Sequence, residues 1–385
     1  MRISTPEFIA LMAMLVATVA LSIDGMLPAL PHIAAQLSPE SPNQAQLILS
    51  SFVVGMALGT FVMGPLSDSF GRKRIIYFGA GLYVLSAAVC MMATSLETML
   101  FARLLQGIGA AGPRVVSHAL VRDLYSGREM ARISSFIMIV FALVPAMAPM
   151  LGAGVMIFFE WQAIFAVFIL FVIISTTWMG LRITEPVTAE NRVAFRYESF
   201  KSAVIEIMSL PIVRTAIVTL VFSYSILFTA LLLVQPVFDQ YFDRAVSFPF
   251  WFALISIFAA SASFVNAMLV MKLGMRRLVS AAFQVQVVWS ISMLLLLNAG
   301  LVSGSLGFAL FVFWVFGVFF HAGMTMGNLT ALAMEPLGHV AGTAASVVSA
   351  FATMGSVILA GIAGQFFNGT PAVVMTGGAV FACCG

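Results

Sequence analysis

The chain has 385 residues, of which 62% are hydrophobic and only 9% are charged. Soluble proteins are about 45–50% apolar and about 25% charged, so this composition excludes a soluble fold and predicts an integral membrane protein. The net charge of +3 carries little information, because in a membrane protein the placement of charge matters more than its sum. The three cysteines, Cys90, Cys383 and Cys384, lack the spacing of metal ligands. We therefore expect no metal site, no disulfide framework and no cofactor.

Hydropathy divides the chain into apolar segments of roughly 18–25 residues, the length that crosses a hydrocarbon core of about 30 Å as a helix. Twelve are predicted: Phe8–Leu30, Gln44–Leu66, Ile75–Thr94, Thr98–Leu120, Ile133–Ile157, Trp161–Leu181, Val213–Val237, Phe248–Met271, Leu278–Asn298, Leu306–Met334, Ala341–Phe366 and Pro371 onward. The last segment would form only about 22 Å of helix. We therefore expect the chain to be truncated within its last helix.

The longest polar interval follows Arg182 and separates six segments from six. It predicts an N-terminal six-helix bundle over residues 1–182, a cytoplasmic linker over 183–212 and a C-terminal six-helix bundle over 213–385. A short surface helix is expected in the linker near Glu198–Met208.

The number of Lys and Arg residues alternates between high and low from one loop to the next. Arg244 alone lies in the loops of one side, Arg103 and Arg114 fall inside the fourth segment, and the remaining cations lie at the other side. Cytoplasmic loops are enriched in Lys and Arg, so both termini and the linker are expected in the cytoplasm.

The most informative stretch lies between the second and third segments. It reads Gly-Pro-Leu-Ser-Asp-Ser-Phe-Gly-Arg-Lys-Arg over residues 64–74. We expect Gly64 and Pro65 to end one helix, Asp68 to cap the next turn, and the cations to hold a tight cytoplasmic loop. A generic positive-inside loop is the alternative for the cations alone.

The spacing of this stretch resembles the loop motif between helices two and three of the major facilitator superfamily. A degenerate echo, Leu-Gly-Met-Arg-Arg over residues 273–277, follows the eighth segment. The resemblance implies twelve transmembrane helices in two six-helix bundles, an all-α major facilitator fold. It also implies a conformational latch formed by Gly64, Asp68, Gly71, Arg72 and Arg74.

Two charges inside the spans are candidates for proton coupling. Asp24 and Arg103 each lie about 9 Å below the same surface by helical rise, so the two side chains could pair. Pro28 removes the hydrogen bond to the Asp24 carbonyl, which predicts a locally opened helix beside the acid. In one interpretation Asp24 takes up and releases a proton while Arg103 modulates its proton affinity. In the other, the two form a static buried pair or extend outward to water.

Two further motifs fall within the fourth and fifth segments. Residues 107–112 read Gly-Ile-Gly-Ala-Ala-Gly, but in mid-span this pattern indicates close helix packing rather than a nucleotide site. Gln106, one turn from Arg103, is expected to share its polar network. Pro145, Pro149 and Gly152 predict a bent, closely packed fifth helix, with an ordinary kink as the alternative. They resemble the helix-five motif of antiporters, G-P-x-x-G-G, with alanine replacing two of its glycines.

Six stretches together look like the Bcr/CflA branch of drug:proton antiporters. They begin at Ser22, Arg103, Val121, Ala148, Trp161 and Ala341. The resemblance implies export of small amphipathic antibiotics in exchange for protons, by alternating access of two bundles in a bacterial inner membrane. The expected partners are therefore a small-molecule substrate, protons and membrane lipid, with no nucleic acid, and the protein is expected to be a monomer.

Weaker candidates for a substrate cavity are the intramembrane polar residues Gln106, Arg114, His321 and Asn328. Uptake of a small polar metabolite by a proton-coupled symporter on the same fold is the alternative function. Enzyme activity is not expected, because catalysis would require clustered His, Asp, Glu or Cys residues and the spans hold isolated ones.

Overall fold

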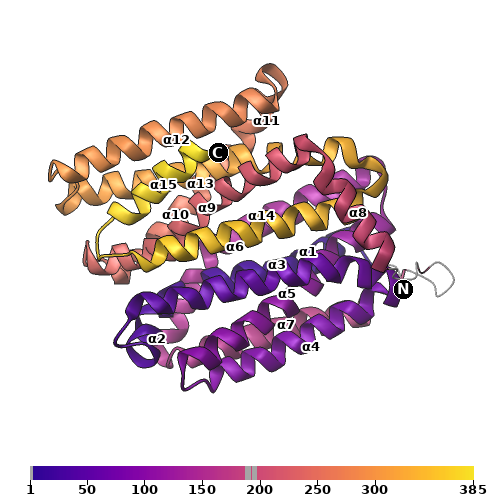
Figure 1. Cartoon of the computed structure of the whole chain (residues 1–385). Coiled ribbons are helices and arrows are strands. Elements are labelled where there is room, and N and C mark those ends of the chain that lie inside the picture. The colour runs from indigo at the N-terminus through magenta and orange to yellow at the C-terminus, as the bar shows by residue number, and fades with distance from the viewer. Residues whose placement is uncertain (1–2, 187–191, 193–196) are drawn as a thin grey trace. The chain divides into compact units, whose positions relative to one another are not determined.

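A computed structural model describes residues 3–186, 192 and 197–385, and every regular element in this part of the chain is helical (Figure 1). The predicted all-α fold is confirmed. The chain divides into two compact units. One comprises Met1–Glu40 and Ser51–Val204, and the other comprises Ser41–Ser50 and Ile205–Gly385.

The first unit is built around α1, which packs against three other helices of that unit, α5, α6 and α7. The α4 helix lies beside both α5 and α7 (Figure 1). The helices of this part of the chain are α1 (Thr5–Asp24), α2 (Leu30–Leu37), α3 (Leu47–Phe70), α4 (Arg72–Met91), α5 (Leu96–Leu124), α6 (Gly127–Phe158) and α7 (Gln162–Arg182). The first turn of α3 groups with the second unit.

The second unit is arranged around α9 and α13. The α9 helix contacts α13, α14 and α15, while α13 also contacts α10, α11 and α12. The helices are α9 (Pro211–Gln240), α10 (Phe248–Ala259), α11 (Ser261–Leu273), α12 (Met275–Asn298), α13 (Gly304–Met334), α14 (Ala341–Gln365) and α15 (Ala372–Cys384).

The predicted short linker helix is present as α8 (Tyr197–Ser209). Residues 187–191 and 193–196 of the predicted linker lie outside the described residues. The division into residues 1–182, 183–212 and 213–385 therefore stays a prediction.

Within the described residues, ten stretches are helical, long and apolar enough to cross a membrane. The α5 helix is not one of them, although at 29 residues it is long enough. It carries Arg103 and Arg114 within its length. The α15 helix is apolar but has only 13 residues. These two helices lie where the fourth and twelfth segments were predicted.

Two predicted segments are interrupted. The first is split into α1, a 3₁₀ turn over Leu27–Ala29 and α2. The opening predicted beside Pro28 is thus confirmed, because α1 ends at Asp24. The eighth is split at Ala260 into α10 and α11. There the Ser261 hydroxyl donates a hydrogen bond to the Phe258 carbonyl (2.6 Å) and competes with the helical ladder.

The turn between α3 and α4 differs from the prediction. Gly64, Pro65 and Asp68 lie inside α3, so the expectation that Gly64 and Pro65 end this helix is wrong, and so is the expectation that Asp68 caps the next turn. The Ser69 hydroxyl donates to the Pro65 carbonyl at 3.2 Å, within the same helix. Gly71 makes the turn alone with φ +101°, a conformation that favours glycine.

Candidate functional site

Arg103 is fully buried in the first unit and is held by three kinds of contact. One terminal nitrogen donates to Gln106 Oε1 at 2.7 Å, and the other donates to the Ser22 carbonyl at 3.1 Å. The guanidinium carbon lies 4.3 Å from the centroid of the Phe52 ring, within the range of a cation–π interaction. Arg103 on α5 is therefore bonded directly to the backbone of α1. The expectation that Gln106 shares its polar network is confirmed.

A second set of hydrogen bonds joins α1 to α4 beside Arg103. The Ser22 and Tyr83 hydroxyls lie 2.5 Å apart, and Ser22 Oγ donates to the Thr18 carbonyl at 2.6 Å. Ser22 and Tyr83 are both buried. A tyrosine placed this deeply in an apolar bundle usually finds a polar partner, and here that partner lies two residues before Asp24.

Asp24 is the last residue of α1 and is 5% exposed. Among the described residues, no hydrogen bond or ion pair is formed by its carboxylate, and no ion pair joins it to Arg103. The ion pair between Asp24 and Arg103, considered because both lie at the same predicted depth in the membrane, is thus not seen. Arg103 instead contacts the backbone of the same turn, at Ser22.

The residues of the motif predicted for the fifth span lie on α6 and pack against the turn that follows Asp24. A Cβ added to Gly152 on α6 would overlap the Gly25 carbonyl oxygen. A Cβ on Gly25 would lie 3.3 Å from the Phe168 ring and 3.5 Å from the Ala148 carbonyl. Pro149 and Gly152 are buried and Pro145 is half-buried, all three within α6. The close packing predicted for the fifth span, which is α6, is confirmed at Gly152. Asp24 and this motif were predicted separately, and both lie at the turn that contains Gly25.

The glycines of α5 serve packing, as predicted. A Cβ on Gly107 would overlap the Phe52 carbonyl of α3, and one on Gly109 would lie 2.6 Å from the Gly79 carbonyl of α4. Gly112 also faces Gly79. These contacts bring α3 and α4 close to α5 and so fix the helix that carries Arg103.

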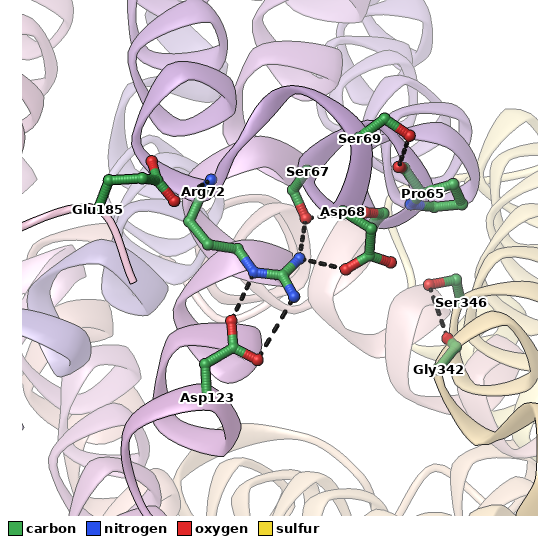
Figure 2. Close-up of polar contacts among 10 residues, drawn as sticks. Pro65, Ser67, Asp68, Ser69, Arg72, Asp123, Glu185, Gly342 and Ser346 are labelled. Atoms are coloured by element: carbon green, nitrogen blue, oxygen red, sulfur yellow. Dashed lines mark hydrogen bonds and ion pairs between the residues drawn. The ribbon is translucent and has the colours of Figure 1, made fainter. Parts of the chain in front are cut away.

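Arg72 is the centre of a second polar cluster, shown in Figure 2. Its guanidinium pairs with Asp68 of α3 at 2.5 Å and with Asp123 at the end of α5 at 2.7 Å, and it donates to Ser67 Oγ at 2.6 Å. Arg72 is 5% exposed. One buried cation thus ties the ends of α3 and α5 to the start of α4.

Glu185, which follows α7, completes this cluster from the other side of the turn. Its two carboxylate oxygens accept hydrogen bonds from the backbone nitrogens of Arg72 and Lys73, both at 2.9 Å. The Lys73 ammonium donates to the Gly180 carbonyl of α7 at 2.9 Å. A carboxylate at a helix N-terminus satisfies free N–H groups and complements the helix dipole.

The predicted latch residues fall into two groups. Three of them, Asp68, Gly71 and Arg72, lie in this cluster. Arg74 is exposed on α4. The Gly64 carbonyl accepts a hydrogen bond from Ser67 Oγ at 2.7 Å. Asp123 and Glu185 were not predicted as members. Asp123 lies in the stretch beginning at Val121 that resembles the Bcr/CflA branch, while the position of Glu185 gave no comparable signal.

The weaker cavity candidates have local partners. Arg114 Nη1 lies 3.6 Å from Met56 Sδ. His321 is buried, with Nδ1 3.3 Å from the Ala282 carbonyl and its ring edge-on to Phe283. Asn328 donates to Asn266 Oδ1 at 2.6 Å.

The sequence matches a family model, the Major Facilitator Superfamily, over residues 11–364. The chain belongs to this superfamily of membrane transporters. It is also 32% identical over 366 residues to the Bicyclomycin resistance protein homolog of Haemophilus influenzae, an alignment that covers 92% of this chain and 89% of the relative. The predicted resemblance to the Bcr/CflA branch is thereby confirmed.

Two further matches extend the comparison. Multidrug resistance protein MdtL of Citrobacter koseri is 36% identical over 143 residues, which are 37% of this chain and 36% of the relative. The crystal structure of a D-xylose-proton symporter superposes with a TM-score of 0.75 at 13% identity, covering 99% of this chain and 97% of the other. At this identity the superposition shows the fold alone, and it confirms the major facilitator fold.

Proposed function

We propose that the protein exports small amphipathic compounds, antibiotics among them, in exchange for protons by alternating access. The observation that carries the proposal is the 32% identity with a bicyclomycin resistance protein homolog over nearly the full length of both chains. The partial match to MdtL supports the same class of substrate. Uptake in symport with protons is disfavoured, because the similarity to a sugar symporter is confined to the fold.

Asp24 is the proposed proton carrier. A charge within a span costs at least about 2.5–3.5 kcal/mol, and Asp24 forms no ion pair among the described residues, so binding a proton would remove much of this cost. Its position at the end of α1, against Gly25 and Gly152, places that event at an interruption of the helix. A proton drives the cycle only if the two conformations bind it with different affinity.

Arg103 is proposed as a positioning residue. Its guanidinium bonds to the Ser22 carbonyl and to Gln106, so it holds the turn that carries Asp24 against α5. The positive charge of Arg103 would act on the proton affinity of Asp24 through its electric field, without a direct contact with the Asp24 carboxylate.

The Arg72 cluster is the proposed cytoplasmic latch. In one conformation Asp68, Asp123 and the backbone contacts of Glu185 hold the ends of α3, α4 and α5 together. In the other, these contacts are weakened. Both termini and the linker are proposed to lie in the cytoplasm, with the protein acting as a monomer in the bacterial inner membrane.

The test is Asp24→Asn, assayed in everted vesicles for drug movement driven by a proton gradient. We expect the variant to insert normally and to lose proton-driven transport. Asp243→Asn is the matched control, since Asp243 is an exposed acid with φ +53°, a backbone conformation that asparagine tolerates. Transport by Asp24→Asn at the wild-type rate would remove Asp24 from the mechanism. Drug movement in the opposite direction in these vesicles would instead indicate uptake.

A further inference from the structure

A pocket of about 510 Å³ opens in the first unit, at the end of α6 and the start of α7. His32 and Gln36 of α2 line one side. Met156, Phe159, Glu160 and Trp161 line the other. None of the residues proposed above for proton coupling or for the latch contributes to it.

The floor of the pocket is fixed. Trp161 is 5% exposed, and its indole nitrogen donates to Gln36 Oε1 at 2.7 Å, which joins the start of α7 to α2. Its ring lies edge-on to Phe165 with centroids 6.2 Å apart. One face of the site is thus set by a buried tryptophan with a hydrogen-bond partner.

The rim supplies a carboxylate. Glu160 is exposed, and among the residues that the structure describes no Lys or Arg lines the pocket. Phe159 is 66% exposed and, like Glu160, lines the pocket. Aromatic faces attract cations, and a carboxylate beside them adds charge complementarity.

The pocket lies far from the Arg72 cluster along the helices. It is at the N-terminal end of α7, whereas Lys73 contacts Gly180 near the C-terminal end of the same helix. The 21 residues of α7 span about 30 Å. On α2, His32 and Gln36 follow the turn that begins at Asp24.

We propose that this pocket is a binding site for a lipophilic organic cation, with Glu160 as the counter-ion and Phe159 and Trp161 as the aromatic contacts. An anionic ligand of the same shape would meet the Glu160 carboxylate, and among the described lining residues His32 alone can carry a positive charge. The site does not rest on the proposed export function, since ligand binding there requires neither a gradient nor a conformational cycle.

The test compares two probes of the same shape and opposite charge, tetraphenylphosphonium and tetraphenylborate. Equilibrium binding of each is measured on the purified full-length protein, for the wild type and for Glu160→Gln. We expect tetraphenylphosphonium to bind the wild type and to lose about tenfold in affinity at this site in Glu160→Gln. Tetraphenylborate is expected not to bind the wild type at this site, and to gain rather than lose affinity in Glu160→Gln, because the repulsion by the carboxylate is removed.

Two variants control the interpretation. Glu97→Gln removes an exposed acid of the same unit that does not line the pocket, and it is expected to bind tetraphenylphosphonium as the wild type does. Glu160→Asp keeps the charge and is expected to retain binding, which guards against an effect of misfolding in the first variant. Equal affinity of Glu160→Gln and wild type for the cation, or equal loss in Glu97→Gln, would overturn the proposal. Failed transport with intact Glu160-dependent binding would count against the export function alone.

Discussion

Arg103 is a fully buried cation whose described partners are a carbonyl, an amide and an aromatic ring. Equal helical depth suggested a carboxylate partner, but depth alone does not specify which side of a helix faces a neighbour. Only a planar guanidinium with several fixed donors reaches both Ser22 and Gln106 while stacking on Phe52. The residue type therefore matters as much as its charge.

Arg103→Lys is expected to preserve the charge but to lose one of the two hydrogen bonds and most of the ring contact. A hydrogen bond to a charged group contributes about 1.5–3 kcal/mol, so we expect a loss of stability of this order. Reversible unfolding by denaturing detergent would measure it. Arg74→Lys, the same change at an exposed position of α4, should leave stability unchanged. Equal stability of the two variants would contradict the proposed positioning role.

At the scale of elements, the contact between the α1 turn and α6 joins two features that the sequence predicted separately. Pro28 identified the break in the first helix because a proline removes a specific backbone hydrogen bond. Small residues and prolines identified a closely packed fifth helix. Neither pattern states which helices meet, because that depends on how helices distant in sequence pack together in three dimensions.

Gly152→Ala tests this contact. The added Cβ would overlap the Gly25 carbonyl, so α6 must shift away from the turn that carries Asp24, and we expect transport to fall at least tenfold with insertion retained. Gly154→Ala is the matched control on the same helix, since a Cβ there meets nothing within 4 Å and alanine favours helix by up to about 1 kcal/mol. Transport rates in vesicles, normalised to the amount of inserted protein, would measure both. Unchanged transport in Gly152→Ala would show that this contact is dispensable.

The turn between α3 and α4 shows more clearly which features could not be predicted from the sequence. Gly64 and Pro65 resemble a helix end in water, but proline is tolerated inside membrane helices, and α3 continues to Phe70. Gly71, with its positive φ, makes the turn alone. Glu185 could not be predicted as the cap of α4, because its role depends on the segment after α7 returning to that turn.

At the scale of the whole molecule, charge is distributed unevenly between the two sets of loops. If the cation-rich loops lie in the cytoplasm, the loops and helix ends of the other side carry Arg244 as their single cation. The same side holds the acids Glu40, Glu97, Glu160, Asp239 and Asp243. An excess of acids at the outer surface would raise the local concentration of organic cations there, which fits the cation pocket at Glu160.

The orientation itself is open to a direct test by cysteine labelling. In a background without Cys90, Cys383 and Cys384, a cysteine is introduced either at Val246, which is 98% exposed, or at Lys201, which is exposed on α8. A maleimide that does not cross the membrane is expected to label Val246→Cys in intact cells. It should label Lys201→Cys only after the membrane is permeabilised, because Lys and Arg are enriched in cytoplasmic loops. Labelling in the reverse pattern would invert the topology, and it would place the Arg72 cluster on the outer side and the Glu160 pocket on the cytoplasmic side.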